Sequence, residues 1–455
     1  MSRLVCVSNR CSAPRRGAAP GGLAVALTAA LRQSGGVWFG WDGSVTENVR
    51  RRPSETEVGG VRYATVPLRK VDYEYYYKGY SNRVLWPLCH YRIDAMEYRP
   101  EYFEGYLRTN EFLARQLLGI LADDDLIWIH DYHLIPLGRS LREAGVSAPL
   151  GFFYHIPFPP FDVLRTMPGA TDLLWAFRAY NLIGFQSDND TRNFLDCIAR
   201  GTGVRVAEDG TINWGERQSC AQTFPIGIDP HDVRSMANSG RNTPTVRRLK
   251  TSLQDRSMMI GVDRLDYSKG LPERFNAFRH LLVKYPETIG RVVLLQVAQP
   301  SREDVPEYND IRLALERTVG EINGHYAEFD WVPIRYLNKS YARQTVINFL
   351  ALAKVGLITP LRDGMNLVAQ EYLAAQNPDD PGVLVLSDFT GAARRLDSVL
   401  KVNPHDIDAV SDTIQIALNM SREERIHRWR SAMEVIEKQD IHWWAERFLT
   451  RLGAT

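Results

Sequence analysis

The feature that most constrains the fold is a pattern repeated along the whole chain: a short apolar run, a few polar residues, and then a helix-forming stretch. Short apolar runs bounded by polar residues are typical of strands buried in a parallel sheet. Their alternation with helices predicts an α/β fold with parallel sheets. The predicted strands are residues 4–8, 37–41, 62–67 (the more exposed one), 126–130, 150–154, 181–185, 257–262, 292–298, 333–337, 355–359 and 383–386.

The chain has 455 residues, which is too long for one ordinary domain and fits two. Small polar residues at 239–243 are the expected link between the two halves of the pattern. We therefore predict two Rossmann-like domains, 1–238 and 239–440, whose parallel sheets face each other across a deep cleft. We expect the last helix, within 441–455, to pack back on the N-terminal domain.

Charge and cysteine content exclude several classes of protein. Lys and Arg number 55 and Asp and Glu 54, so no general basic field is available for nucleic acid or a membrane. The five cysteines are scattered without a Cys-x-x-Cys pair, which indicates reduced thiols in a cytoplasmic protein and no zinc site. No apolar stretch approaches the roughly 20 residues of a membrane span, and the first apolar run is too short for a signal peptide.

One stretch, from Ile358 to Glu371, combines a strand end, a turn and a helix start at Asn366. This geometry presents backbone N–H groups to an anion. Asp363 lies in the turn and Glu371 in the helix, so the two acids could hold sugar hydroxyls while the amides hold phosphate. The alternative is that Asp363 only caps the loop and Glu371 is an exposed helix charge.

Two cations follow the predicted strand 257–262, just before the predicted helix 271–285. Arg264 offers a planar fork and Lys269 a point charge, which together suit a diphosphate, although a solvated loop is the alternative. In the first half, Gly21 and Gly22 lie between a predicted strand and helix, where glycine lets the backbone approach a ligand. They lack the Gly-x-Gly-x-x-Gly spacing of a dinucleotide site.

The carboxyl ends of two strands in the first half carry Asp131 and His155, where α/β sheets bind ligands. The segment 73–91 is rich in aromatic residues and is either core or a sugar platform. An Asp-rich run at 123–125 precedes its strand, so it lies at the wrong edge for a metal–nucleotide site and is interpreted as a solvated turn.

Several motifs that span nearly the whole chain carry a family resemblance. They are Ser8-Asn9-Arg10, Gly21-Gly22-Leu23, Trp38-Phe39-Gly40-Trp41, Val84-Leu85-Trp86-Pro87, Trp128-Ile129-His130-Asp131-Tyr132-His133-Leu134, Gly151-Phe152-Phe153, His155-Ile156-Pro157-Phe158-Pro159, Arg264-Leu265-Asp266-Tyr267-Ser268-Lys269-Gly270 and Pro360-Leu361-Arg362-Asp363-Gly364-Met365-Asn366-Leu367-Val368. With them the sequence resembles the trehalose-6-phosphate synthases of glycosyltransferase family 20, retaining enzymes that join a nucleotide-glucose to glucose 6-phosphate.

The resemblance implies a GT-B fold and assigns roles to matching positions. It places in the acceptor site Arg10, Tyr77, Asp131 and Arg302, with the arginines near the phosphate, and gives anomer selection to Trp86 and Ile156. It places in the donor site Gly21, Gly22, Arg264 and Lys269 near the diphosphate, Tyr341 beside the nucleoside, and Asp363, Leu367, Val368 and Glu371 on sugar and ribose. It implies a catalytic set of Arg264, Lys269, Asp131, His155 and Asp363, with His155 beside the donor glucose.

The implied reaction joins UDP-glucose and glucose 6-phosphate to give α,α-trehalose 6-phosphate and UDP, the first step of trehalose biosynthesis, with no metal or other cofactor. The family also implies a cytoplasmic homodimer or homotetramer and a separate phosphatase downstream. The chain departs from the family at Gln370, where lysine is common, and at Arg394-Arg395, where Asn-Glu is frequent. Two alternatives are a related synthase that uses another acceptor (a glucosylglycerol-phosphate synthase or an amino-cyclitol synthase) and a non-catalytic sugar-phosphate sensor.

Overall fold

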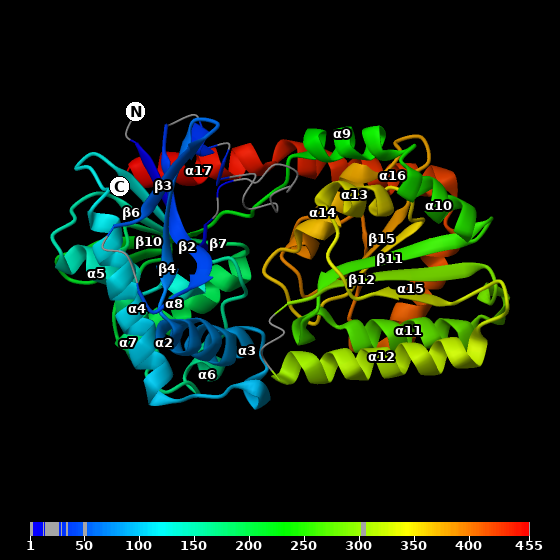
Figure 1. Ribbon diagram of the computed structural model, residues 1–455, viewed down its shortest axis with the longest axis horizontal. Helices are drawn as coiled ribbons and strands as arrows, with labels where there is room; N and C mark the ends of the chain where they lie inside the picture. Colours follow the sequence, from blue (N-terminus) through cyan, green and yellow to red (C-terminus); the bar gives the residue numbers. More distant parts are fainter. Residues whose placement is uncertain are drawn as a thin grey trace. The chain divides into compact units, whose positions relative to one another are not determined.

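The computed structural model describes residues 3–11, 13, 27–28, 30–32, 35–48, 52–301 and 306–454. The chain forms two compact units, and each is built on one central sheet (Figure 1). The first unit comprises Met1–Ile226 and His442–Thr455, and the second comprises Gly227–Ile441.

The sheet of the first unit is parallel through its centre and has antiparallel pairs at both edges. Its spatial order is β3-β4-β2-β1-β5-β6-β7-β10-β9-β8. The strands are β1 (Leu4–Arg10), β2 (Val37–Val45), β3 (Ser54–Val58), β4 (Val61–Leu68), β5 (Leu126–His130), β6 (Leu150–Phe153), β7 (Leu182–Phe185), β8 (Arg205–Val206), β9 (Thr211–Asn213) and β10 (Gln218–Thr223). The central strands are buried because their residues are apolar on both faces.

The helices of the first unit include an uncommon π-helical segment, η1. They are α2 (Lys70–Asp72), η1 (Tyr73–Leu85), α3 (Trp86–Cys89), η2 (Ile93–Ala95), α4 (Pro100–Leu118), η3 (Tyr132–Leu134), α5 (Leu137–Glu143), α6 (Phe161–Leu164), α7 (Ala170–Ala176), η4 (Phe177–Ala179), α8 (Asp188–Thr202) and α17 (Ile441–Gly453). Single π-turns recur at functional sites in proteins, and η1 carries much of the aromatic segment that the sequence analysis singled out.

The last helix, α17, covers the core of the first unit. The ring of Phe448 stacks on that of Trp128 at 4.6 Å, and the ring of Trp444 lies 4.8 Å from it. Gly151 on β6 and Gly184 on β7 make room for this helix, because a Cβ atom at either would lie 2.8 Å from the Phe448 ring.

The sheet of the second unit is entirely parallel, in the order β13-β12-β11-β14-β15-β16. Its strands are β11 (Ser257–Arg264), β12 (Val292–Gln299), β13 (Ile334–Leu337), β14 (Val355–Ile358), β15 (Val383–Ser387) and β16 (Leu400–Val402). Its helices are α9 (Pro230–Gly240), α10 (Pro244–Leu253), η5 (Tyr267–Lys269), α11 (Leu271–Lys284), η6 (Pro286–Thr288), α12 (Pro306–Tyr326), α13 (Arg343–Leu350), α14 (Leu367–Ala375), η7 (Ala392–Arg394), α15 (Ile407–Asn419) and α16 (Arg422–Lys438). Figure 1 shows α13 and α14 on one face of this sheet and α11 and α12 on the other.

The predicted parallel α/β architecture is confirmed. The predicted strand 62–67 is β4, and it is more exposed than the first two strands as expected, because only three of these six residues are buried whereas residues 4–8 and 37–41 are all buried. One local expectation about the first unit is wrong. The Asp-rich run is not wholly solvated: Asp125 is 1 % exposed and accepts two hydrogen bonds of 2.7 Å from the Arg3 guanidinium. Asp125 therefore ties the start of β5 to the start of β1.

The predicted boundary at residue 238 lies too late in the chain, because the first unit ends at Ile226. The helix α9 follows this boundary and packs on α13 and α14, so it belongs to the second unit. The residues 239–243, which we expected to link the domains, connect α9 to α10 inside that unit.

Within the described ranges, no helix is both long and apolar enough to cross a membrane. All five cysteines are buried as free thiols.

Candidate functional site

The strand–turn–helix stretch in the second unit has the predicted form. β14 ends at Ile358, and Asn366 caps α14 by accepting a hydrogen bond of 3.3 Å from the Ala369 amide. Asn366 adopts a φ of 71°, a left-handed conformation that is uncommon for a residue other than glycine. The turn also packs closely on Gly391, where a Cβ atom would lie 2.0 Å from the Gly364 carbonyl oxygen. The conformation of this loop is therefore tightly fixed.

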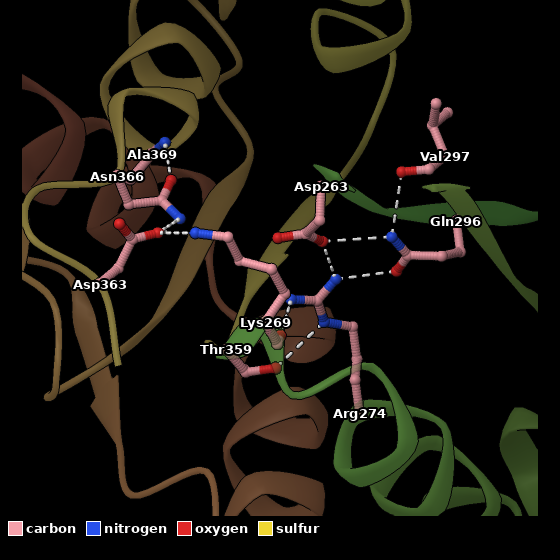
Figure 2. A network of polar contacts seen from close by, with 9 residues as sticks. All are labelled: Asp263, Lys269, Arg274, Gln296, Val297, Thr359, Asp363, Asn366 and Ala369. Atoms are coloured by element: carbon pink, nitrogen blue, oxygen red, sulfur yellow. Dashed lines mark hydrogen bonds and ion pairs between the residues drawn. The ribbon is translucent and has the colours of Figure 1, made fainter. Parts of the chain in front are cut away.

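The turn acid is held by a cation from a neighbouring loop. Lys269 Nζ lies 2.6 Å from Asp363 Oδ2, and the same oxygen accepts a hydrogen bond of 3.1 Å from Asn366 Nδ2 (Figure 2). The side chain of Lys269 is only 9 % exposed, so the ion pair is well shielded from solvent. Gly270 has a φ of +62° and lies against the Thr359 carbonyl oxygen, which leaves no room for a side chain. Two predicted donor-site residues thus meet in one shielded pair.

A buried arginine, Arg274, contacts the loop that carries the Lys269–Asp363 ion pair. The sequence analysis did not identify this residue. Arg274 on α11 donates to Asp263, to Gln296 Oε1 at 2.8 Å, and to Thr359 Oγ1 at 3.0 Å (Figure 2). It also donates to the Lys269 carbonyl oxygen at 3.3 Å. Its guanidinium therefore joins the ends of β11 and β14 and the middle of β12 to the loop that carries Lys269. In the sequence, the signal for this role is only that Arg274 lies four residues after Gly270, in the helix that follows the Lys269 loop.

The second acid is paired as well. Arg343 donates to Glu371 Oε1 at 3.2 Å and to Asp232 Oδ2 at 2.7 Å. The side chain of Glu371 is 12 % exposed, which contradicts the alternative of an exposed helix charge. Burial raises the pKa of Glu371 above its ordinary value, although the nearby Arg343 opposes that effect. Arg343 thus positions Glu371 in the first turns of α14, and sequence reasoning missed it.

The remaining predicted donor-site residues lie around the same sheet edge. Arg264 is the last residue of β11 and is exposed. Tyr341 is held by the Phe349 ring at 5.5 Å and by Lys339 Nζ, which lies 5.1 Å over its ring. Leu367 and Val368 form the half-buried first turn of α14.

In the first unit, Arg10 ends β1 and is exposed. Its guanidinium carbon lies 4.5 Å from the centre of the Trp41 ring, a cation–π contact. Gly43, with a φ of +90°, makes space for it, because a Cβ atom there would lie 2.2 Å from the guanidinium. Tyr77 on η1 also packs on Trp41, with ring centres 5.4 Å apart, and stacks on His133 at 6.0 Å. Arg10 and Tyr77 therefore share one aromatic platform.

Asp131 has a strained backbone conformation. Its φ of 78° and ψ of 163° fall in a region that is essentially restricted to glycine, and such strain clusters at functional sites. Its Oδ1 accepts a hydrogen bond of 3.3 Å from the backbone N–H of His155. The carboxylate thus joins the carboxyl ends of β5 and β6.

The ring of His155 is fixed by two further residues, His130 and Gln186, from the neighbouring strand ends. Gln186 Oε1 accepts from the Ile226 amide at 3.0 Å, so its Nε2 donates to His155 Nδ1 at 3.4 Å. His155 therefore carries its proton on Nε2 and donates it to His130 Nδ1 at 3.0 Å. Burial lowers the pKa of His155 to about 3, so the ring is neutral at physiological pH. The His155 ring is therefore held in one orientation and carries no charge. The sequence analysis did not predict its contacts with His130 and Gln186.

The two positions expected to select the anomer are buried. Trp86 is 3 % exposed and packs on His90 at 4.1 Å and on Tyr132 at 5.9 Å, while Ile156 is 8 % exposed. Gly21, Gly22 and Arg302, which the resemblance also places in the site, lie outside the described residues.

The sequence analysis noted two departures from the family, at Gln370 and at Arg394-Arg395. Gln370 is buried, and Arg395 donates a hydrogen bond of 2.8 Å to Gln439 Oε1.

Each unit thus gathers charged and polar groups at the carboxyl ends of its parallel strands, where open α/β sheets bind ligands. Two such units in one chain occur in the GT-B class of glycosyltransferases, and the fold of this chain is of that class. The family model for glycosyltransferase family 20 matches residues 11–454, and the chain belongs to this family.

Curated relatives and solved structures match the whole chain. A trehalose-6-phosphate synthase of Sinorhizobium fredii is 44% identical over 460 residues, which cover 100% of this chain and 99% of the relative. A UDP-forming α,α-trehalose-phosphate synthase of Burkholderia xenovorans, solved in complex with glucose 6-phosphate, superposes with a TM-score of 0.95 at 45% identity and covers 99% of this chain and 100% of its own. The Escherichia coli structure bound to UDP-2-fluoro glucose gives a TM-score of 0.95 at 45% identity, covering 99% of each chain.

Proposed function

We propose that this chain is a retaining glucosyltransferase that makes α,α-trehalose 6-phosphate from UDP-glucose and glucose 6-phosphate and releases UDP. The observation that carries the proposal is the shielded pair of Lys269 and Asp363 at the carboxyl edge of the second sheet, with Arg264 and Glu371 at the same edge. Full-length identity of 44% to a trehalose-6-phosphate synthase supports the same reaction.

Cleavage of the bond to the donor glucose develops positive charge on the sugar and negative charge on the leaving diphosphate. We assign the stabilisation of the diphosphate to Arg264 and Lys269, because preorganised charges often contribute more to catalysis than any other effect. Asp363 orients Lys269 through the 2.6 Å contact and is positioned to meet sugar hydroxyls. Leu367, Val368, Glu371 and Tyr341 then surround the ribose and the base, and Gly21 and Gly22 are proposed to lie near the diphosphate.

The acceptor is proposed to bind to the first unit. Arg10 binds its phosphate, Tyr77 provides an aromatic wall, and Asp131 meets a sugar hydroxyl; Arg302 is proposed as a second phosphate ligand. Trp86 and Ile156, both buried, shape the acceptor site from behind, and neutral His155 lies beside the donor glucose. The enzyme is further proposed to be a cytoplasmic homo-oligomer whose product passes to a separate phosphatase.

Incubation of the protein with UDP-glucose and glucose 6-phosphate is expected to give one disaccharide phosphate and an equal amount of UDP. Mass spectrometry and NMR of the anomeric protons identify the product and its α,α linkage. Glycerol 3-phosphate and an amino-cyclitol phosphate serve as competing acceptors in parallel incubations. A preference for either of these would replace the proposed acceptor, and the absence of any transfer by folded protein would favour the sensor.

Turnover is expected to be independent of divalent metal, because the two cations of the second unit supply the charge that a metal ion would otherwise provide. The rate is measured before and after exhaustive chelation. A fall of more than about tenfold that magnesium restores would mean that a metal ion contributes over ~1.4 kcal/mol to lowering the barrier. In that case a metal ion, and not Arg264 and Lys269 alone, compensates the charge on the leaving diphosphate.

Arg10→Ala is expected to lower the ratio of kcat/KM for glucose 6-phosphate to kcat/KM for glucose by at least about tenfold. A hydrogen bond to a charged group contributes about 1.5–3 kcal/mol, and glucose never makes the contact with the phosphate-binding arginine. Arg62→Ala, at the amino end of β4, is the matched control and leaves the ratio unchanged. Equal losses with both acceptors in Arg10→Ala would show that Arg10 supports the fold or serves the donor.

A further inference from the structure

A second cluster of charge lies far from the residues discussed above. A pocket of about 430 Å³ in the first unit is lined by Arg139, Arg142, Arg178 and Arg217, with Glu143 and Trp175 among the other lining residues. Four arginines face one glutamate there, in a chain whose formal net charge is only +1. The basic character of the pocket is therefore local and does not follow from the overall composition.

The pocket lies at the opposite edge of the sheet from Asp131 and His155. Arg142 binds the Ala148 carbonyl oxygen just before β6 begins, and it also binds Asn181 just before β7 begins. Asp131 and His155 follow the carboxyl ends of their strands. A four-residue strand such as β6 spans roughly 13 Å, so the two edges are separate. The pocket is not an extension of the acceptor site.

Arg142 is the centre of the cluster. Its guanidinium donates to the carbonyl oxygens of Val146 and Ala148 at 2.8 Å, of Ala179 at 3.0 Å, and to Asn181 Oδ1 at 2.8 Å. All of these acceptors are neutral, and no acidic side chain among the described residues forms an ion pair with it. Burial and the nearby Arg217 lower its pKa to about 10, so its charge is retained at neutral pH but is poorly compensated. A bound anion would supply the missing compensation.

Two other arginines of the lining are also available to an anion. Arg178 on η4 and Arg217 before β10 are exposed, and neither guanidinium forms a hydrogen bond or ion pair with a described residue. Arg139 differs, because it donates to Glu143 at 2.8 Å. Guanidinium groups bind phosphate with paired N–H donors, which Arg178 and Arg217 can both offer. Arg142 uses four of its five N–H groups within the protein, so it can offer its charge and one N–H to the anion.

The rim of the pocket carries an aromatic surface. Trp175 at the end of α7 is 41 % exposed, and its ring lies 5.5 Å from that of Trp214, which is buried and holds it in place. An exposed indole next to guanidinium groups suits a flat heterocycle attached to phosphates, because the ring stacks while the charges pair. The volume of about 430 Å³ falls within the range of small-molecule sites.

We propose that this pocket is a peripheral binding site for a nucleoside polyphosphate, whose phosphates lie among Arg142, Arg178 and Arg217 and whose base lies on Trp175. The site is independent of the proposed transferase chemistry, because it occupies the other edge of the sheet. Arg142 also pins the segments before β6 and β7, so a ligand on its guanidinium contacts the framework of the first unit directly.

The test is isothermal titration of the full chain with ADP, with pyrophosphate and with adenosine, in the presence of saturating UDP and glucose 6-phosphate. These two additions fill the proposed substrate sites. The test variant is Arg178→Gln/Arg217→Gln, which spares the structural Arg142. The matched control is Arg247→Gln/Arg248→Gln, which removes two exposed arginines from α10. Trp175→Leu tests the base contact, and the melting temperature of each variant verifies its fold.

We expect ADP to bind more tightly than pyrophosphate, and adenosine not to bind at millimolar concentration. Arg178→Gln/Arg217→Gln should weaken ADP at least tenfold while the control double variant keeps the parent affinity. Trp175→Leu should reduce ADP to the affinity of pyrophosphate. No binding of ADP to the parent chain, equal affinity in the two double variants, or unchanged ADP affinity in Trp175→Leu would each overturn the proposal. Synthesis of trehalose 6-phosphate without ADP is expected to be normal in Arg178→Gln/Arg217→Gln. A failure of the nucleotide-site proposal can therefore be distinguished from a failure of the proposed transferase function.

Discussion

Arg264→Ala is expected to lower kcat by about two to three orders of magnitude, which is the usual effect of removing one preorganised charge partner of a transition state. Arg264 is the last residue of β11 and is exposed, five residues before the shielded Lys269. The negative charge on the diphosphate grows as the glycosidic bond breaks. The interaction with Arg264 should therefore be stronger in the transition state than in the bound donor, and its loss should appear in kcat.

The control for this variant is Arg291→Ala. Arg291 directly precedes β12, at the amino edge of the same sheet, and is exposed as well. Steady-state kinetics with both substrates varied separates kcat from KM. A normal kcat with only a raised donor KM in Arg264→Ala would mean that Arg264 binds the ground state and the transition state equally. Loss of activity in Arg291→Ala would show that the effect is not confined to the functional edge.

Arg274→Met is expected to lower the free energy of unfolding of the second unit by about 3–5 kcal/mol, the typical cost of removing one partner of a buried ion pair. The side chains of Arg274 and Asp263 are 0 % and 1 % exposed, so neither charge can be compensated by water. After the substitution, the one side-chain contact that Asp263 keeps with a described residue is that with Gln296 Nε2 at 3.2 Å. The unfolding transition in urea, followed by circular dichroism, measures the change.

Two further variants separate the buried charge from simple loss of packing. Arg279→Met lies on the same helix but is exposed, and its effect should stay within about 0.5 kcal/mol. Asp263→Leu/Arg274→Met replaces both charges with apolar groups and should recover much of the lost stability. If the double variant is as unstable as Arg274→Met, the cost comes from the cavity and the lost hydrogen bonds to Gln296 and Thr359, and the buried charge is not its cause.

The order of strands and helices was predictable because each buried strand is a short apolar run with polar residues at its end. Strand β5 has the predicted bounds, and α14 begins directly after Asn366 as expected. The exposed strand β3 could not be predicted, because it has no apolar run and forms only by pairing with β4. The boundary between the units was also misplaced, since it depends on where α9 packs and not on local composition.

Site residues could be predicted only where two conditions held: the residue is of a type that binds ligands, and it lies just after the end of a predicted strand. Lys269 and Asp363 satisfied both conditions, and they form an ion pair. Arg274 and Arg343 were missed because they lie within or at the start of helices, and the partners that define their roles are far away in the chain. Arg343 binds Asp232, which is 111 residues distant. Such pairings are decided by tertiary packing, for which a single sequence carries no local signal.

The position of α17 has a consequence for synthesis on the ribosome. The second unit is one continuous segment and can fold as soon as it has emerged from the ribosome. In the first unit, by contrast, α17 can pack on Trp128 only after Gly227–Ile441 has been synthesised. Until then Gly151 and Gly184 leave a hollow on the nascent sheet where Phe448 will lie. The N-terminal half of the chain is thus made first but completed last, and during that interval the apolar surface that α17 will cover stays exposed, which favours aggregation.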